Sequence, residues 1–352
     1  MAFVALEEVV KEKTLNVRNC ERCGNERAVT LPYGPHNFCK NHFIHFFEKR
    51  VKKTIRAFNL IEKNELVVAG LSGGKDSAAL VSILAEVIPR KENLIAVSID
   101  EGIEGYRDLA VDEAKKLCKS LGIRHEILSY KERFGTTMVE VVQEIEKQKL
   151  KNKSCSFCGV FRRRLLNDAA QELNADKLAT GHNLDDELQS ILMNFFSNNL
   201  SRLSRLGPIT GTKKVKGLIP RIKPLYTTPE KDVLTYCFLK EIPHYSEQCC
   251  PFSYQAKRNI FRETINKMED ELPGSKYSAL NSFLELRQAL KGFEQKGEML
   301  ECIKCGAITS NEVCKSCLFL EQLKVKPENK KIEFSGPDRI RTGDPRHVKA
   351  MP

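Results

Sequence analysis

Between residues 60 and 240, short apolar runs alternate with longer stretches whose apolar residues recur at helical spacing. The short runs have the length of buried strands, and the longer stretches are typical of helices that pack on a sheet. The predicted strands span residues 65–71, 94–100, 125–128 and 177–180. The predicted helices span residues 77–87, 106–121, 139–149, 160–173 and 185–196. This alternation predicts an α/β fold with a doubly wound parallel sheet.

Polar or glycine-rich turns follow three of the predicted strands, at residues 72–77, 100–105 and 181–186. In a doubly wound sheet, ligands bind at the carboxyl ends of the strands. We therefore expect these three turns to meet in one ligand site.

The first of these turns has the sequence Ser-Gly-Gly-Lys-Asp-Ser. A strand, a glycine loop and a helix N-terminus together turn backbone N–H groups and a positive helix end toward a phosphate group. The spacing differs from that of the Walker loop. It resembles the pyrophosphate loop of enzymes that split ATP into AMP and pyrophosphate. We expect ATP to bind at Ser72, Gly73, Gly74, Lys75, Asp76, Ser77, Asp100, Gly181 and His182.

The composition is that of a folded, basic protein. Of its 352 residues 41% are hydrophobic, and the net charge of +11 favours a polyanionic partner. Residues 147–164 and 201–223 each contain seven Lys or Arg residues and no Asp or Glu. Runs of one sign are usually solvated surface, but these two flank a cysteine pair described below. They therefore predict nucleic-acid contact.

The chain contains no apolar run of about 18 residues, so no membrane span is expected. Its N-terminus lacks the basic and apolar regions of a signal peptide. We therefore expect a cytoplasmic protein with no membrane partner. Thirteen cysteines in such a protein predict metal binding or catalysis rather than disulfides.

Two groups of cysteines have the spacing of structural zinc sites. Two residues between paired ligands let a tight turn bring both to one ion. The segment that holds the second group is too short for a core of its own, so a zinc ion would supply its folding energy. We expect two Zn²⁺ ions. The predicted ligands are Cys20, Cys23, Cys39 and His42 at the first site, and Cys302, Cys305, Cys314 and Cys317 at the second.

A third motif, Cys155-Ser-Phe-Cys158-Gly159, has no second pair nearby; the next cysteines are Cys237, Cys249 and Cys250. Three thiolates from distant segments suit an iron–sulfur cluster with one iron not held by cysteine. A persulfide carried by the Cys-x2-Cys pair is the alternative. Cys118 and Cys237 lie in helical patterns and are predicted to be core residues.

The chain is accordingly divided into five parts. We expect a zinc finger and linking helix at 1–55, the ATP-binding α/β domain at 56–245, a helical extension at 246–297, a zinc ribbon at 298–322 and a disordered tail at 323–352.

In combination and order, these motifs resemble those of the archaeal and eukaryotic tRNA 2-thiouridine synthases of the two-zinc-finger, pyrophosphate-loop type. The resemblance covers about residues 18–322 and includes the two zinc motifs, the loop 72–77, the motif 155–159, the turn 181–186 and Cys250-Pro251-Phe252. It implies a tRNA sulfurtransferase. ATP adenylates the C2 oxygen of a uridine and pyrophosphate leaves; a sulfur species then attacks C2 and expels AMP.

The resemblance also implies residue roles. Cys155, Cys158 and Cys250 would hold a [4Fe-4S] cluster. The family shows one cysteine before the proline, whereas Cys249 adjoins Cys250 here. Asp186 and Arg162 would be catalytic, although relatives often have lysine at the second position. Mg²⁺ would neutralise pyrophosphate, with Asp76 or the pair Asp185–Asp186 as its ligands.

Relatives divide between the wobble uridine, position 34, and T-loop position 54. The Cys-x2-His of the first finger resembles the T-loop enzymes, whereas residues 201–206, 220–224 and 314–321 resemble the wobble enzymes, so position 34 is favoured.

Two other classes stay open: a pyrophosphate-loop ligase acting on a small molecule, and a non-catalytic zinc-ribbon RNA-binding protein. The implied partners are tRNA, a second copy of the chain, and a sulfur donor that is sulfide, a persulfide or a ubiquitin-like carrier.

Overall fold

The computed structural model describes residues 19–34, 36–211, 217–246, 250–252, 258–293, 299–325 and 334. Residues 1–18, Cys249 and nearly all of the tail predicted at 323–352 lie outside the described residues. Within the described part, no helix is long and apolar enough to cross a bilayer.

A six-stranded sheet forms the centre of the molecule, in the order β5-β4-β3-β6-β8-β7. Neighbouring strands are parallel except at β7, which pairs antiparallel with β8. The strands are β3 (Val67–Gly70), β4 (Leu94–Asp100), β5 (Arg124–Ser129), β6 (Lys177–Ala179), β7 (Ile209–Thr210) and β8 (Arg221–Ile222). The chain runs from β3 outward to β4 and β5 and then returns to β6 on the other side of β3, so the strand order reverses between β3 and β6. The predicted doubly wound parallel sheet is therefore confirmed.

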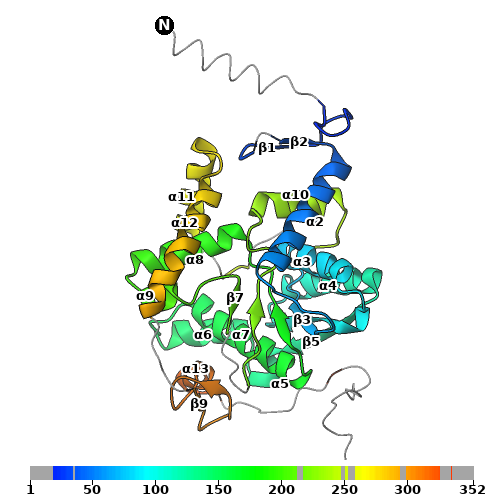
Figure 1. Cartoon of the computed structure of the whole chain (residues 1–352). Helices are drawn as coiled ribbons and strands as arrows, with labels where there is room; N and C mark the ends of the chain where they lie inside the picture. Colours follow the sequence, from blue (N-terminus) through cyan, green and yellow to red (C-terminus); the bar gives the residue numbers. More distant parts are fainter. Residues whose placement is uncertain are drawn as a thin grey trace, which may run out of the picture.

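Helices cover both faces of the sheet, which gives three layers (Figure 1). Val67 and Ala69 of β3 pack into one core, whereas Val68 packs into the other, because successive strand side chains point to opposite faces. The first face is covered by α2 (Lys40–Ala57), α3 (Lys75–Val87), α4 (Arg107–Leu121) and α10 (Glu230–Leu239). The second is covered by α5 (Tyr130–Phe134), α6 (Met138–Lys147), α7 (Ser154–Glu172) and α13 (Lys315–Gln322).

A smaller third core lies beside the sheet. Leu184 and Leu188 pack with Ile265 and Leu280, which come from two helices that follow the α/β domain. The elements here are α8 (Leu184–Phe196), α9 (Leu200–Leu203), α11 (Arg258–Glu271) and α12 (Ser275–Leu290), which ends in the short turn η3 (Lys291–Phe293). Figure 1 shows α11 and α12 side by side against α8.

Two small hairpin modules lie at opposite ends of the molecule (Figure 1). One is formed by β1 (Val29–Leu31) and β2 (His36–Phe38) before α2, and the other by β9 (Leu300–Glu301) and β10 (Ile308–Thr309) before α13. A turn of 3-10 helix, η1 (Lys91–Asn93), precedes β4.

Most predicted elements lie within a few residues of the observed ones, but the start of α7 was misplaced, and the short elements α5, α9, β7 and β8 were missed. Helix α7 begins at Ser154 rather than near residue 160, so Cys155 and Cys158 lie in its first two turns. Strands β7 and β8 were not predicted, because two residues are too short to show an alternating pattern.

Candidate active site

The turn after β3 folds on itself through its serine hydroxyls. Ser77 Oγ accepts a hydrogen bond from the Ser72 backbone N–H at 3.0 Å and donates one to the Gly74 carbonyl at 2.9 Å. The two hydroxyls, of Ser72 and Ser77, lie 3.0 Å apart. These contacts fix the loop at the N-terminus of α3, where the helix end is positive and orphan N–H groups collect.

Two glycines allow this loop to pack closely. Gly73 has φ +84°, and a Cβ there would lie 2.0 Å from the Ala110 carbonyl oxygen. At Gly181, which follows β6, a Cβ would lie 2.9 Å from the Asp76 backbone. The turns after β3 and β6 therefore touch at the point where the strand order reverses, which is where doubly wound sheets bind ligands.

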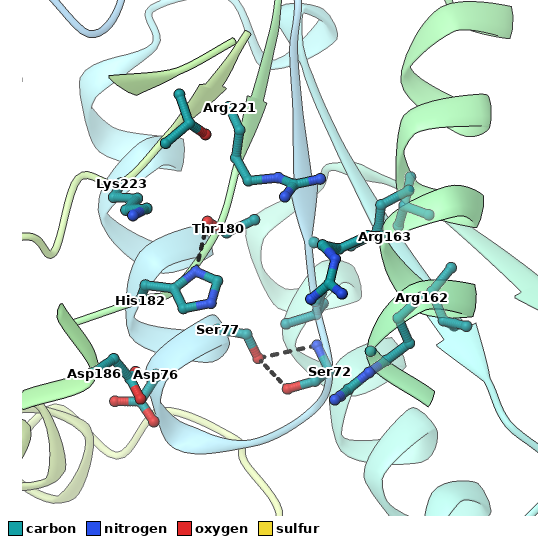
Figure 2. A pocket seen from close by; sticks show the side chains of 18 of the residues that line it. Ser72, Asp76, Ser77, Arg162, Arg163, Thr180, His182, Asp186, Arg221 and Lys223 are labelled. Carbon is teal, nitrogen blue, oxygen red and sulfur yellow. Dashed lines mark hydrogen bonds between the residues drawn. The ribbon is translucent and has the colours of Figure 1, made fainter. Parts of the chain in front are cut away.

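A pocket of about 490 Å³ opens at this point (Figure 2). Ser72 and Ser77 line it from the loop, and Asp76 and Asp186 lie together at one end. Arg162 and Arg163 reach it from α7. Thr180, His182, Arg221 and Lys223 line it from the ends of β6 and β8. The sheet has thus brought Ser72, Asp76, Ser77, Gly181, His182, Asp186 and Arg162 together, as the sequence suggested.

Four of the residues predicted to bind ATP, namely Gly73, Gly74, Lys75 and Asp100, do not line this pocket. The Lys75 ammonium is paired with Asp76 at 2.9 Å and with Glu230 at 2.8 Å. Burial opposes its charge, but these two carboxylates outweigh burial and raise the pKa of Lys75. Asp100 Oδ1 accepts the Gly102 N–H at 2.8 Å and so closes the turn after β4.

Asp186 and Asp185 have different surroundings. Asp186 caps α8 together with Asn183 and pairs with Arg258 at 3.2 Å. Burial and the neighbouring Asp76 carboxylate raise the pKa of Asp186 to about 6, against the opposing effect of Arg258. Asp185 is buried; it accepts the Glu230 N–H at 2.8 Å and pairs with Lys276 at 2.5 Å. Asp186 therefore faces the pocket, whereas Asp185 holds α8, α10 and α12 together.

His182 is held in a neutral state. Its Nδ1 lies 2.9 Å from Thr180 Oγ1. Burial and the nearby cations, among them Lys223 and Arg221, lower the pKa of His182 to about 3. A neutral imidazole can both donate and accept hydrogen bonds in this pocket.

A buried carboxylate supports the loop and Arg162. Glu101 is 2% exposed and is paired with Arg107, whose Nη1 donates to the Ser72 carbonyl at 2.7 Å. Arg162 Nε lies 3.8 Å from Glu101. The negative charge of the Cys158 thiolate has the largest effect on Arg162 and raises its pKa. Glu101 acts in the same direction, and burial opposes both. Arg162 therefore connects the pocket with the cysteine pair.

Cys155, Cys158 and Cys250 lie near one another at the start of α7. Cys155 Sγ is 3.7 Å from the Phe252 carbonyl oxygen, and Tyr130 Oη is 3.7 Å from Cys158 Sγ. Cys250 is close enough to Cys155 and Cys158 for their charges to interact. Burial raises the pKa of Cys158, and Arg162 opposes this effect. Three thiols beside a guanidinium are a donor set that suits a thiolate-bound iron–sulfur cluster.

The two predicted zinc groups have the geometry of single-ion sites. In each group all four ligand atoms lie within 4.8 Å of one another, and among the described residues no other group of three or more His, Cys, Asp or Glu meets this limit. Cys23 and Cys39 sulfurs are 3.7 Å apart, and Cys305 and Cys314 sulfurs are 3.6 Å apart. Zn–S bonds of about 2.3 Å in a tetrahedron require roughly 3.8 Å between sulfurs. Both donor sets therefore fit Zn²⁺.

The second group is docked on the helix that bears Cys155 and Cys158. Arg164 Nη1 donates to Cys305 Sγ at 3.1 Å, and its Nε is 2.7 Å from Asp168. Phe319 of α13 packs on Phe157 of α7 with 4.2 Å between ring centroids. The ribbon is therefore part of the second core rather than a separate appendage.

Comparison with known proteins places this site in a family. A family model for the PP-loop domain matches residues 44–269. The chain is 39% identical over 323 residues to the tRNA 2-thiolation protein NcsA of Haloferax volcanii, covering 87% of this chain and 99% of that protein. It is 36% identical over 310 residues to the cytoplasmic tRNA 2-thiolation protein 1 of Danio rerio, covering 86% and 88%.

The chain belongs to the PP-loop family of tRNA 2-thiolation proteins. The family resemblance predicted from the motifs is thereby confirmed. Among solved structures, the U34-tRNA thiolase NcsA from Methanococcus maripaludis with its [4Fe-4S] cluster is similar in fold, with a TM-score of 0.74 and 35% identity. That match covers 88% of this chain and 97% of the other.

The structure also shows charged pocket residues that were not predicted from the sequence. They are Glu101, Arg107, Arg163, Glu187, Arg221, Lys223 and Arg258. Glu101 lies in the turn 100–105, and Arg163, Arg221 and Lys223 lie in the two basic runs, so a pattern had marked their segments. No pattern marked Arg107 or Arg258, because a cation on a helix surface looks the same in the sequence wherever it points.

Proposed function

We propose that this protein is an ATP-dependent tRNA uridine 2-sulfurtransferase that acts at the wobble position, 34. One observation carries the proposal: Arg162 lines the nucleotide pocket and lies close enough to Cys158 for their charges to interact. The ATP-binding turn and the cysteines that would handle sulfur therefore meet at one place. The relatives named as tRNA 2-thiolation proteins support the reaction, and the solved U34-tRNA thiolase supports the position.

In the proposed first step the uridine C2 oxygen attacks the α-phosphorus of ATP. An O–P bond forms, the bond to pyrophosphate breaks, and pyrophosphate leaves. The hydroxyls of Ser72 and Ser77 and the N-terminus of α3 are suited to its negative charge. Asp76 and Asp186 line the pocket together and would hold Mg²⁺, which adds charge neutralisation there. Neutral His182 would hydrogen-bond to the nucleotide.

In the proposed second step a sulfur nucleophile attacks C2, the C2–O bond breaks and AMP leaves. Cys155, Cys158 and Cys250 would hold a [4Fe-4S] cluster, which supplies an iron not held by cysteine where sulfur can bind. Arg162 would stabilise the negative charge that develops as C2 accepts sulfur. In the alternative, Cys155 and Cys158 pass on a persulfide sulfur and form a disulfide. Sulfide, a persulfide and a ubiquitin-like carrier are the candidate donors.

The rest of the assignment follows the chain. We propose Zn²⁺ on Cys20, Cys23, Cys39 and His42, and on Cys302, Cys305, Cys314 and Cys317. The parts 1–55, 246–297 and 298–322 would act as attachments to the ATP-binding domain, 56–245, and two copies of the chain would form a homodimer. A cytoplasmic location is supported by the name of the Danio rerio relative. Position 54 is the alternative target, suggested by the Cys-x2-His of the first finger.

The reaction is tested by release of AMP and pyrophosphate from ATP under anaerobic conditions. We expect release of both products to depend on an unmodified tRNA transcript, and release of AMP to depend also on a sulfur donor, because pyrophosphate leaves before sulfur attacks. Release without tRNA would favour the small-molecule ligase, and no release would favour the non-catalytic RNA-binding protein.

The cofactor is tested by the visible spectrum and the metal content of the anaerobically purified protein. A brown protein with about four iron and two zinc per chain would support the cluster. A colourless protein that cannot be reconstituted would favour the persulfide route.

A further inference from the structure

Apart from Arg162, which lies 3.8 Å from Glu101, the cations of the pocket fall into two groups. Lys223 pairs with Glu187 at 2.7 Å, Arg258 with Asp186 at 3.2 Å, and Arg107 with Glu101. Arg163 and Arg221, in contrast, form no ion pair with a carboxylate of the described residues. Each of the first three cations is thus neutralised within the protein, whereas these two are not.

Both unpaired guanidiniums are held at the pocket (Figure 2). Arg163 lies back along α7 over Gly159, where a Cβ would be 3.3 Å from Nη1 of Arg163. The small residue that ends the motif 155–159 therefore leaves room for this guanidinium. Arg221, on β8, has a buried Nε with no hydrogen-bond partner.

The two guanidiniums lie close enough to repel each other. Burial and the charge of Arg163 lower the pKa of Arg221 to about 10. Burial, Arg162 and Arg202 lower the pKa of Arg163. Two neighbouring cations on a pocket wall, one of them the half-buried Arg221 with an unused Nε–H donor, are stabilised by an anion, and a phosphate oxygen matches the planar donor fork of arginine.

The position of the two residues points to the source of this phosphate. The turn containing Ser72 and Ser77 provides a separate phosphate-binding end for ATP, and Arg221 lies across the pocket from it (Figure 2). Arg163 belongs to the basic run 147–164 and Arg221 to the basic run 201–223. These two runs therefore converge on the wall of one pocket, which Arg162 also lines (Figure 2).

We propose that Arg163 and Arg221 together bind one backbone phosphate of the tRNA next to the target uridine, and so hold that nucleotide in the pocket. The inference rests on the proposed function and adds the residues that position its substrate. These two arginines are positioning residues, because they hold the substrate without touching the reacting atoms.

The first test measures binding of an unmodified tRNA transcript, with uridine at position 34, over a range of salt concentrations. We expect Arg163→Gln, Arg221→Gln and the double variant to bind about tenfold or more weakly. In the double variant, the slope of log K against log salt concentration should become less steep by about 0.7–0.9. This is the change expected when one phosphate contact is lost, and the loss of two contacts would give twice that change. ATP affinity should not change.

The matched control is Arg205→Gln. Arg205 belongs to the basic run 201–223, as Arg221 does, but it does not line the pocket, and its Nε donates to the Ser201 carbonyl of its own turn. We expect its effect on tRNA binding to be smaller than that of either pocket variant. Equal effects of Arg205 and Arg221, or a loss of ATP affinity in the Arg221 variant, would overturn the proposal; the second result would assign the site to the nucleotide.

A second test leaves the protein unchanged, so it does not depend on how the variants fold. Single neutral methylphosphonates replace the phosphates on either side of the target uridine. One of these two methylphosphonates should weaken binding of the tRNA to the wild-type protein about tenfold. The same methylphosphonate should have little further effect on binding to the double variant. Equal losses with both proteins at every position would contradict the proposal. Thiolation by the wild-type protein is measured in parallel. If thiolation occurs, a negative result contradicts the phosphate-binding proposal and not the proposed function.

Discussion

Gly73 determines whether the turn after β3 can form. Its φ of +84° is unfavourable for other residues, and a Cβ would lie 2.0 Å from the Ala110 carbonyl oxygen, which is fixed in α4. Gly105 has a similar φ of +71° but no heavy atom within 4 Å of a Cβ. Comparing the same substitution at Gly73 and Gly105 therefore separates the cost of backbone strain from the cost of a steric clash.

We predict that Gly73→Ala lowers the free energy of unfolding by more than about 3 kcal/mol and abolishes ATP binding, because strain and clash add. Gly105→Ala should cost only about 1–2 kcal/mol and leave ATP binding intact. Urea unfolding and ATP titration measure both. Similar behaviour of the two variants would show that the contact with Ala110 is unimportant.

The three cysteines at the start of α7 give a second prediction at this scale. Cys155→Ser, Cys158→Ser and Cys250→Ser should each reduce thiolation by more than about a hundredfold, because a serine oxygen is a poor iron ligand and cannot carry sulfur. ATP binding and thermal unfolding should change little.

The control for these variants is Cys118→Ser, in the other core, where the thiol is 2% exposed and should affect stability rather than thiolation. An active Cys250→Ser protein together with an inactive Cys249→Ser protein would move the third ligand to Cys249.

His182 gives a prediction about pH. Its folded-state pKa of about 3 lies below the ordinary value of 6.5, so its contribution to stability is present above pH 6.5 and is lost as the pH falls toward 3. At pH 4.5 this loss amounts to at most about 2–3 kcal/mol relative to pH 7. The variant His182→Gln should not show this loss of stability between pH 7 and pH 4.5. Urea unfolding at both pH values compares the proteins; parallel losses in the two would contradict the neutral, buried state of His182.

At the scale of elements, a buried ion pair connects α12 to α8. Lys276 of α12 and Asp185 of α8 are 4% and 3% exposed and lie 2.5 Å apart. Lys231 of α10 and Asp270 of α11 form an ion pair in the same region, but their side chains are 71% and 63% exposed.

We predict that Lys276→Met costs about 3–5 kcal/mol of unfolding free energy, because it leaves a carboxylate buried without a cation. Lys231→Met should cost less than about 1 kcal/mol. Chemical denaturation at pH 7 measures the difference. Equal costs would mean that α12 is held by its apolar contacts alone.

The elements show what could be predicted from the sequence. The β3–α3 turn and the α8 N-terminus were predicted closely, because glycines, a capping residue and apolar periodicity mark these boundaries locally. The first turn of α7 was missed, since Cys-Ser-Phe-Cys-Gly has low helix propensity and is helical only through its packing on α13 and α5. Lys75 is predicted to bind phosphate, and the sequence could not show that it also pairs with Glu230, because that residue is far away in the chain.

At the scale of the whole molecule, the two hairpin modules lie at opposite ends (Figure 1), and the pocket lies at the carboxyl ends of the central strands. The ribbon is fixed to α7 through Arg164 and Phe319, close to the cysteine pair. The basic runs meet at the pocket wall through Arg163 and Arg221. A large polyanion could therefore contact both runs while one of its nucleotides enters the pocket.

The most direct test of the central claim is to map 2-thiouridine in a product tRNA. The protein is purified anaerobically and incubated with ATP, Mg²⁺, sulfide and a transcript that contains uridine at positions 34 and 54, and the digested RNA is analysed by mass spectrometry. We predict 2-thiouridine at position 34 only, dependent on ATP and absent with Cys158→Ser. Thiolation at position 54, or none with a protein that contains its metals and binds tRNA, would contradict the account.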